Sequence, residues 1–395
     1  MTFCKKSHNA QFFSDVNAIS NRIWEELNCT NNIYLSIGYL NALAKHHKNI
    51  LFYYVVLFDK QQKAIAFSTI QIVSFNTTKA QNNALFSSEK LKCLAEQLHI
   101  IPKKKPIKIL TSGNTFVSGE HGIFIKNNQN KQQVIKQLAQ SVVYFVKNTP
   151  KLQENIKAYM LKDFVKESLP ITDKLHEADY YSFKVEPNMI MAIDKEWLSF
   201  TDYLASMKTK FRVKAKKAIQ LSTVLNCEEI TSNNLEMYLP KMTQLYNAVA
   251  DKAGFNLGKF NLNAFIDLKG NLGNNYIIKA YFLNNQLVGF LSAIINQNQL
   301  DAHFVGIDYT RNKDYAIYQR MLYDYIAIAI EKKATLINFG RTASEIKSSV
   351  GAIPQDLTIY LRHKKNIPNK LLSLFLSKIK PTPFKQKKPF KAKTI

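Results

Sequence analysis

Apolar residues along the first half of the chain are spaced in a way that predicts alternating helices and strands. Apolar positions at helical spacing indicate helices over 32–47, 81–98 and 132–147. Apolar runs bounded by polar turns indicate strands over 50–58, 64–73, 107–111, 122–125 and 156–161. Between two of these strands, Gly113, Gly119 and Gly122 lie within ten residues of one another, which indicates a loop with unusual backbone geometry.

The second half repeats this order of elements. Helices are predicted over 208–221, 235–253 and 315–333, and strands over 276–283, 287–296, 300–307, 335–339 and 357–362. The helix over 315–333 is so apolar that only a narrow stripe can face water, so we expect it to be largely buried. The segments 58–68 and 282–292 share a polar turn followed by a small residue and Phe. This echo suggests duplicated domains, with a chance likeness of two hairpins as the alternative.

The length of 395 residues favours two domains rather than one core. We place the first over 1–187 and the second over 188–365. The remaining segment, 366–395, has eight lysines and no acidic residue. Its apolar residues up to 379 fall on one helical face, which predicts a basic amphipathic helix, and after Pro381 we expect disorder.

The chain is strongly basic, with 54 Lys and Arg against 29 Asp and Glu and a formal net charge of +25. This excess predicts attraction to an anionic partner, namely nucleic acid, an acidic lipid surface or a phosphate-bearing cofactor. A generally lysine-rich surface is the alternative. The charge is most concentrated in the helix that begins at Lys208, and Arg311 precedes the later apolar helix. We predict phosphate binding by Lys208, Lys210, Arg212 and Arg311.

Membrane and redox signals are weak. The four cysteines show no Cys-x-x-Cys spacing, which fits a reducing compartment and gives no indication of a metal site. The first twenty residues lack an apolar signal-peptide region, and the longest apolar run, 50–58, is too short to span a bilayer. We therefore expect a cytoplasmic protein. The lysine-rich tail suggests peripheral attachment to the inner face of the membrane, and packing of the tail helix on the second domain is the alternative.

Charged residues gather in the segment 338–354, directly after a predicted buried strand. Arg341, Glu345 and Lys347 are expensive to place in a core, so we expect them to line a cleft that holds a polar ligand. Arginine offers a planar fork for a carboxylate or phosphate. We predict substrate binding by Arg341, Lys347, Asn338 and Tyr360. A solvated surface position for Lys347 is the competing interpretation.

Three stretches resemble the FemAB-like peptidyl/acyl-transferases of the GNAT superfamily. They are the basic helix 207–218, the helix 235–255 that ends in Gly-Phe, and the segment 287–360 with its Phe339-Gly-Arg-Thr sequence. The resemblance implies an α/β (α+β) fold of tandem GNAT-like domains, each a mixed, mostly antiparallel sheet flanked by helices. The segment 306–316 departs from simple GNAT enzymes because it lacks the glycines that cradle the coenzyme A pyrophosphate.

The resemblance also implies a reaction, the transfer of an acyl or aminoacyl group to an amine. The co-substrate would be acyl-CoA, acyl carrier protein or aminoacyl-tRNA, with no tightly bound cofactor. The acceptor would be an amino acid, an amino-lipid or a cell-wall precursor. A non-catalytic basic module that binds nucleic acid or anionic membrane is the alternative, and the oligomeric state is open.

Acylation of an amine needs a base, because an ammonium group is not a nucleophile. The candidates are Glu345, His303, Asp308, Glu120 and His121. Each has a structural alternative. Glu345 could form a salt bridge with Arg341 or Lys347. His303 could be a structural residue, as a single histidine in a strand often is. Glu120 and His121 could be ordinary polar residues of a turn.

Overall fold

The computed structural model describes residues 4–7, 9–75, 107–252 and 258–392. The helix predicted over 81–98 lies outside the described residues. The chain divides into two compact units. Unit 1 comprises Met1–Glu186, Gly254–Phe260 and Asp356–Pro381, and unit 2 comprises Pro187–Ala253, Asn261–Gln355 and Thr382–Ile395. Each unit is described by itself.

The sheet of unit 1 runs in the order β1 (Cys4–Ser7), β2 (Ala10–Phe13), β3 (Leu51–Phe58), β4 (Ala64–Phe75), β5 (Ile107–Ser112), β7 (Ile156–Phe164) and the second part of β14 (Ile353–His363). Neighbouring strands are antiparallel except for the parallel pair β5 and β7. A short strand, β6 (Ile123–Ile125), pairs with β4. All five strands predicted for this half of the chain are confirmed.

The helices of unit 1 are α1 (Asn21–Leu27), α2 (Ile37–His46), α5 (Lys131–Lys147), α6 (Pro150–Asn155), α7 (Leu169–Thr172) and α15 (Asn366–Leu376). The longest, α5, begins after Asn130, whose side chain accepts a hydrogen bond from the backbone N–H of Gln133 at 3.1 Å. Its apolar face, including Ile135 and Leu138, is buried in the core cluster that contains strands β3 to β7. This packing fixes the position of Lys131 at the start of the helix.

Strand β7 contains a bulge that shapes the site described below. Leu161 pairs with Tyr360 and Phe164 pairs with Thr358, so Lys162 and Asp163 lie opposite a single residue of β14. Asp163 has φ of 69°, in the left-handed region that Asp tolerates better than most residues. The bulge therefore brings Lys162 and Asp163 next to each other at the end of a buried strand.

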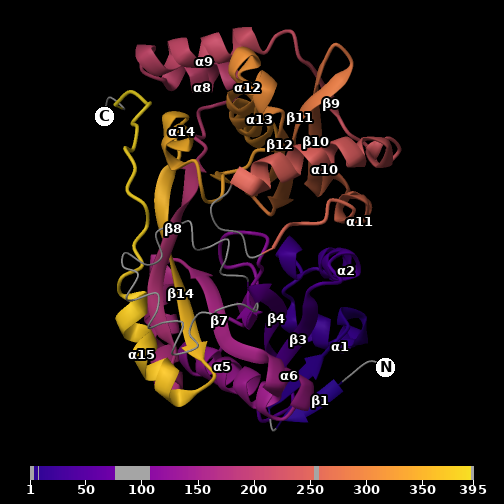
Figure 1. The fold of residues 1–395 in the computed structure, drawn as a ribbon, viewed down its shortest axis with the longest axis vertical. Coiled ribbons are helices and arrows are strands. Elements are labelled where there is room, and N and C mark those ends of the chain that lie inside the picture. The colour runs from indigo at the N-terminus through magenta and orange to yellow at the C-terminus, as the bar shows by residue number, and fades with distance from the viewer. Residues whose placement is uncertain (1–3, 8, 76–106, 253–257, 393–395) are drawn as a thin grey trace. The chain divides into compact units, whose positions relative to one another are not determined.

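The strands of unit 2 run in the order β8 (Tyr181–Ala192, of which the residues from Pro187 on belong to this unit), β13 (Leu336–Asn338), β12 (Gln299–Ile307), β11 (Gln286–Asn296), β10 (Tyr276–Leu283) and β9 (Asn226–Glu229). Its one parallel pair among the described strands is β12 with β13. Helices α8 (Phe200–Ser206), α9 (Thr209–Leu221), α10 (Leu235–Lys252), α11 (Ala264–Leu272), α12 (Tyr309–Tyr315), α13 (Ile317–Glu331) and α14 (Ser344–Ser349) surround these strands (Figure 1).

Helix α13 is the buried helix that the sequence predicted. Its apolar residues, including Met321, Leu322 and Ile326, belong to the core of unit 2. Asp324 on this helix is only 7% exposed. Its carboxylate accepts hydrogen bonds from Tyr281 Oη at 2.6 Å and from Arg320 Nε at 3.1 Å. These bonds compensate the burial of the charge and fix α13 against β10.

The C-terminal segment corrects two expectations. Helix α15 belongs to unit 1, where Leu372, Phe375 and Leu376 on its apolar face are buried, so these residues are not open to a membrane. Residues 382–392, which we call the strap, belong to unit 2 and are not disordered. The backbone N–H of Lys391 donates to Ser206 O at 3.0 Å, and the Phe390 ring packs against Trp197 at 5.3 Å.

The boundaries of the units also differ from the predicted domain limits of 187 and 365. The stretch 356–365 and helix α15 belong to unit 1 rather than to the second domain and a separate tail. No helix within the described ranges is long and apolar enough to cross a membrane. In the same ranges, no group of three or more His, Cys, Asp or Glu side chains is arranged to hold a metal ion.

Candidate functional site

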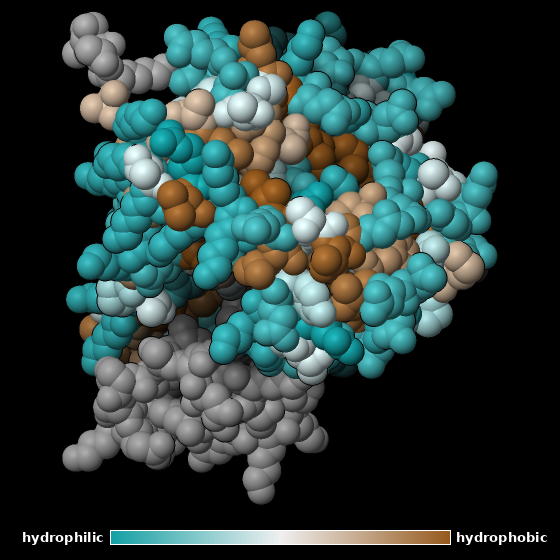
Figure 2. Space-filling view, turned by 90° about the horizontal axis from the view of Figure 1, so that it is seen from above, coloured by the Kyte–Doolittle hydropathy of each residue, from teal (hydrophilic) through white to brown (hydrophobic). Residues whose placement is uncertain are grey.

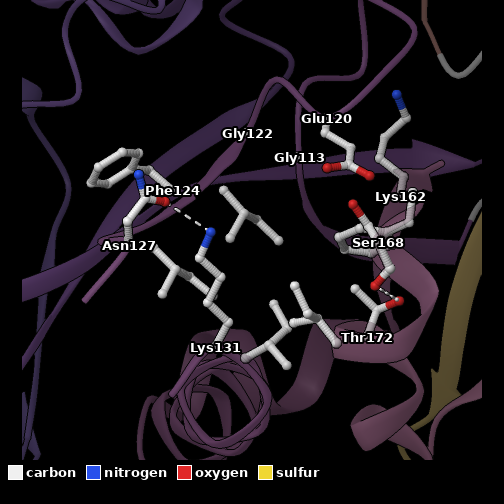
Figure 3. Close-up of a pocket in the computed structure, with 14 residues that line it drawn as sticks. Gly113, Glu120, Gly122, Phe124, Asn127, Lys131, Lys162, Ser168 and Thr172 are labelled. Carbon is white, nitrogen blue, oxygen red and sulfur yellow. Dashed lines mark hydrogen bonds between the residues drawn. The ribbon is translucent and has the colours of Figure 1, made fainter. Parts of the chain in front are cut away.

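A cavity of about 290 Å³ lies in unit 1. This volume is at the lower end of the range of roughly 300–1,000 Å³ found for small-molecule sites. The wall consists of the glycine-rich loop 113–122, strand β6, the start of α5, the bulge of β7 and the turn into α7 (Figure 3). Its polar and charged lining residues are Glu120, Asn127, Lys131, Lys162, Ser168 and Thr172, and its apolar ones include Ile123, Phe124, Ile125, Ile135, Phe164 and Ile171.

Glycines are required where the glycine-rich loop closes on itself. A Cβ atom on Gly122 would lie 2.2 Å from Gly113 Cα, so the two ends of the loop are in backbone contact. Gly113 has φ of 138°. This confirms the unusual backbone geometry that three nearby glycines predicted.

The buried Lys162 holds this loop in place. Its Nζ atom donates hydrogen bonds to Asn114 O at 2.7 Å and to Val117 O at 3.0 Å, and it forms an ion pair with the Asp163 carboxylate. Both side chains of the pair are almost completely buried. Figure 3 shows the Lys162 ammonium directed away from the centre of the cavity. Lys162 therefore supports the loop, while the cavity receives the side chain of Glu120.

The Glu120 carboxylate is the chemically distinctive group of the cavity. It accepts a hydrogen bond from the backbone N–H of Val165 at 2.8 Å. Glu120 is an exposed residue at the edge of the cavity, but partial removal of its carboxylate from water raises its pKa above the usual value, against the opposing effect of hydrogen bonds from Ser168 and Val165. In the described ranges no lysine or arginine forms an ion pair with it. A carboxylate with a raised pKa that faces a cavity is suited to accept a proton from a bound amine.

The wall next to Glu120 contains Ser168 and Thr172, which the sequence analysis missed. Thr172 Oγ1 donates to Ser168 O at 3.2 Å and lies 2.9 Å from the hydroxyl of Tyr360. Tyr360 in turn donates to Asp173 Oδ1 at 2.6 Å. Tyr360 was predicted to bind substrate together with Arg341, but it belongs to unit 1 and Arg341 to unit 2. Its role here is to fix Thr172 at the cavity wall.

In unit 2, Arg341 and Lys347 lie in and after the turn that follows β13. Thr342 and Ala343 in this turn have φ of 67° and 49°, which is unfavourable for residues with a side chain. Lys347 is 5% exposed, and its Nζ donates to Arg341 O at 2.7 Å and Gly340 O at 3.2 Å. Burial lowers the Lys347 pKa to about 7. Lys347 therefore supports the strained turn from inside and is not a solvated surface lysine.

Arg341 and Asn338 are the other two predicted binding residues of this region. Arg341 is half-buried, and burial lowers its pKa to about 10, so it remains a cation at neutral pH. Asn338 is buried at the end of β13, and its Oδ1 accepts a hydrogen bond from Gly340 N at 2.9 Å. Asn338 thus shapes the start of the turn, and Arg341 is the predicted ligand-binding cation that stays partly accessible.

The comparisons with known proteins concern the fold. No protein-family model and no curated protein matches the sequence. Solved structures do match. FemX aligns with a TM-score of 0.50 and 12% identity over 81% of this chain and 90% of FemX. A tandem GNAT protein from the clavulanic acid biosynthesis pathway aligns with a TM-score of 0.54 and 6% identity over 90% of this chain and 99% of that one.

The chain has the fold of FemX and of the tandem GNAT protein. This confirms the predicted fold class of tandem GNAT-like domains with mixed, mostly antiparallel sheets. At these identities the likeness concerns the fold alone. The chemistry has to be argued from the residues of this chain.

Within the second half of this FemAB-like fold, three predicted catalytic residues have structural partners. Glu345 is exposed and forms an ion pair with Lys387 of the strap at 2.5 Å, not with Arg341 or Lys347. The hydrogen bond from Lys387 lowers the pKa of Glu345, which makes its carboxylate a weaker base. Asp308 is the N-cap of α12, and its Oδ1 accepts from Thr310 N at 2.9 Å.

His303 lies among aromatic rings at a bulge of β12. Its Nδ1 is 3.3 Å from Tyr276 Oη and 3.4 Å from Ser292 Oγ, and its ring packs against Phe265 and Phe304. Burial lowers its pKa to about 3, so the ring is neutral at physiological pH and a very weak base. In unit 1, the ring of His121 packs against Tyr34 at 4.4 Å. Among the predicted bases, Glu120 has the geometry best suited to the task.

The predicted phosphate-binding residues lie on two helices of unit 2. Lys208 precedes α9 and is tied to the strap, because its N–H donates to Pro389 O at 2.8 Å and its Nζ to Lys388 O at 3.2 Å. Lys210 is exposed, and Arg212 is half-buried with its guanidinium near Met207 O. Arg311 is exposed on α12. This short helix is formed by the segment that lacks the glycines of simple GNAT enzymes.

The sequence analysis also did not identify Lys131 and Lys162 as residues of the cavity wall. Lys131 was read as the residue before a helix, and the predicted strand ended at Leu161, one residue before Lys162. The glycine cluster was the available signal, because a tightly folded loop needs a neighbouring group to satisfy its backbone carbonyls. Figure 3 shows Lys131 extending from α5 to Asn127, to whose Oδ1 its Nζ donates at 2.9 Å.

Proposed function

We propose that this protein is an N-acyltransferase that moves an acyl or aminoacyl group from a thioester or ester donor to an amine. The observation that carries the proposal is the Glu120 carboxylate, which faces a cavity of unit 1 and has a raised pKa, within a GNAT-type acyltransferase fold. Glu120 is the proposed general base. Ser168 and Val165 keep its carboxylate oriented through their hydrogen bonds.

The proposed step balances as follows. The amine nitrogen attacks the acyl carbonyl carbon and forms a C–N bond, and the C–S or C–O bond to the donor breaks. The proton leaves the nitrogen for the Glu120 carboxylate, which then passes it to the donor's thiolate or alkoxide, so that Glu120 is regenerated. A carboxylate with a raised pKa is a stronger base than one with an ordinary pKa and accepts the proton more readily.

The donor and the acceptor belong to the proposal as classes. Acyl-CoA, acyl carrier protein and aminoacyl-tRNA all carry phosphate, and α9 and α12 offer exposed cations such as Lys210 and Arg311 for it. Arg341 is the proposed contact in unit 2 for an anionic part of a substrate. An amino acid, an amino-lipid and a cell-wall precursor are the acceptor classes. The proposed place of action is the cytoplasm, with or without attachment to the inner face of the membrane.

The reaction is tested with purified full-length protein and one donor of each class, each offered with a mixture of amines. Mass spectrometry of the products should show acylated amine. Glu120→Gln should lower the turnover number by about 10²–10⁴-fold. Glu25→Gln is the matched control, since Glu25 is an exposed glutamate on α1 of the same unit. Folded wild-type protein that transfers nothing from any donor would refute the reaction, and full activity of Glu120→Gln would refute the base.

A second candidate function is polyanion binding without catalysis. The exposed residues of α9 include Lys210, Lys214, Lys216 and Lys217, and this helix has no acidic residue. Figure 2 shows that hydrophilic side chains cover most of the face seen from above, with hydrophobic ones between them. Salt-dependent RNA binding together with absent acyl transfer would favour this candidate. Replacing two of these lysines by Gln should then reduce the slope of log K against log salt by about 1.5–2.

A further inference from the structure

The cavity of unit 1 has two charged groups of opposite sign that are not paired with each other. Glu120 lies on the glycine-rich loop, and Lys131 lies at the start of α5. The Lys131 ammonium donates a hydrogen bond to the neutral side-chain amide of Asn127. Within the part of the chain that the structure describes, neither group takes part in an ion pair. Glu120 is exposed and Lys131 is half-buried, so both charged groups remain accessible to a ligand of opposite charge.

The lining between these two charges is apolar. Figure 3 shows Glu120 and Lys131 on different sides of the cavity with apolar side chains between them. Ile123, Ile135 and Ile171 contribute to this lining. Lys162, the other cation at the wall, is already bound to Asp163 and to two loop carbonyls, so it does not neutralise Glu120. The cavity thus offers a negative group, an aliphatic surface and a positive group.

We infer that the cavity binds an amine acceptor that is a zwitterion, with its amine at Glu120, its anionic group at Lys131 and an aliphatic segment between them. The inference rests on the proposed function for the role of the amine as acceptor. The chemical class is an amino acid whose reacting amine is separated from its carboxylate by several methylene groups. The volume of about 290 Å³ admits a molecule of that size.

Binding can be measured without any acyl donor, by calorimetry on the full-length protein. The probes are 6-aminohexanoate, hexylamine, which lacks the carboxylate, and hexanoate, which lacks the amine. We expect 6-aminohexanoate to bind about tenfold or more tightly than either of the others, because a hydrogen bond to a charged group contributes roughly 1.5–3 kcal/mol.

Two variants separate the ends of the ligand. Glu120→Gln should weaken 6-aminohexanoate and hexylamine and leave hexanoate unchanged. Lys131→Met should weaken 6-aminohexanoate and hexanoate and leave hexylamine unchanged. Lys147→Met removes an exposed lysine from the last turn of the same helix and should change none of the three affinities.

The outcomes distinguish this inference from the proposed reaction. Equal affinity for the three probes, or affinities that neither variant changes, would overturn the inference. Absence of binding of all three would also overturn it. Charge-selective binding of 6-aminohexanoate by a protein that acylates no amine would support the inference and refute the reaction. Acyl transfer to amines together with charge-independent binding would support the reaction and refute the zwitterionic class.

Discussion

The buried ion pair between Lys162 and Asp163 gives the most quantitative prediction. Their side chains are 4% and 0% exposed. Lys162→Met would leave the Asp163 carboxylate buried without its cation and would also remove the hydrogen bonds to Asn114 O and Val117 O. Removal of one partner of such a pair costs about 3–5 kcal/mol. At roughly 2–4 °C per kcal/mol for a unit of this size, the Tm should fall by about 6–20 °C.

A double variant tests whether the uncompensated charge is the cause. Lys162→Met with Asp163→Asn removes both charges, and Asn accepts the φ of 69° at this position well. We expect it to recover at least half of the lost free energy of unfolding. The assay is urea unfolding followed by circular dichroism. Lys136→Met is the control, because the Lys136–Glu177 pair is exposed enough to contribute only about 0–1 kcal/mol.

Two results would refute this reasoning. One is a loss of less than 1 kcal/mol in Lys162→Met. The other is a double variant that is no more stable than the single one, which would assign the cost to the lost loop contacts rather than to the charge.

Three further predictions concern other parts of the chain. The free energy of unfolding of wild type, relative to Lys347→Met, should rise by up to about 1.4 kcal/mol per pH unit from pH 7 to pH 10. The reason is that the folded pKa of Lys347, about 7, lies below its unfolded pKa, so in this range the unfolded chain binds one more proton than the folded chain. An equal pH dependence of the two proteins in urea unfolding would contradict this. Gly122→Ala should destabilise unit 1 by about 1–3 kcal/mol, since its Cβ would meet the backbone of the loop. The matched Gly270→Ala in α11 has open space and should stabilise by about 0.5–1 kcal/mol in the same assay. Phe390→Ala should release the strap and speed proteolysis of residues 382–392, with exposed Lys388→Met as the control that leaves the digestion pattern unchanged.

Strongly periodic segments were predicted well, because burial of an apolar face determines their conformation. Strands β3, β4, β10 and β11 and helices α5, α9 and α10 lie within a few residues of their predicted limits. Short elements such as α8, β9 and α12 were not predicted. They have few residues, and their formation depends on caps and on packing partners that are distant in sequence, such as the capping box of Ser199 and Asp202.

The candidate site was predicted only in part. Glu120 was found because glycines and titratable groups coincide in one loop. The roles of Glu345, Asp308 and His303 could not be read from sequence, because each is decided by a contact with a distant residue or by aromatic burial. The strap was predicted to be disordered from its lysines, but Phe384 and Phe390 anchor it in the core of unit 2. Two aromatic residues outweighed the composition of the whole segment.

The path of the chain has a consequence for how this protein is made. Unit 1 receives residues 356–363 of β14 and helix α15 only after the chain has passed through most of unit 2, and the strap then returns to unit 2. On the ribosome, β7 therefore cannot pair with β14 until nearly all of the polypeptide has been translated. A fragment cut at the first boundary would leave that strand edge unpaired, which invites self-association. No single cut yields two complete units, because a fragment meant to isolate unit 1 needs residues 356–381 grafted on, and one meant to isolate unit 2 needs the strap.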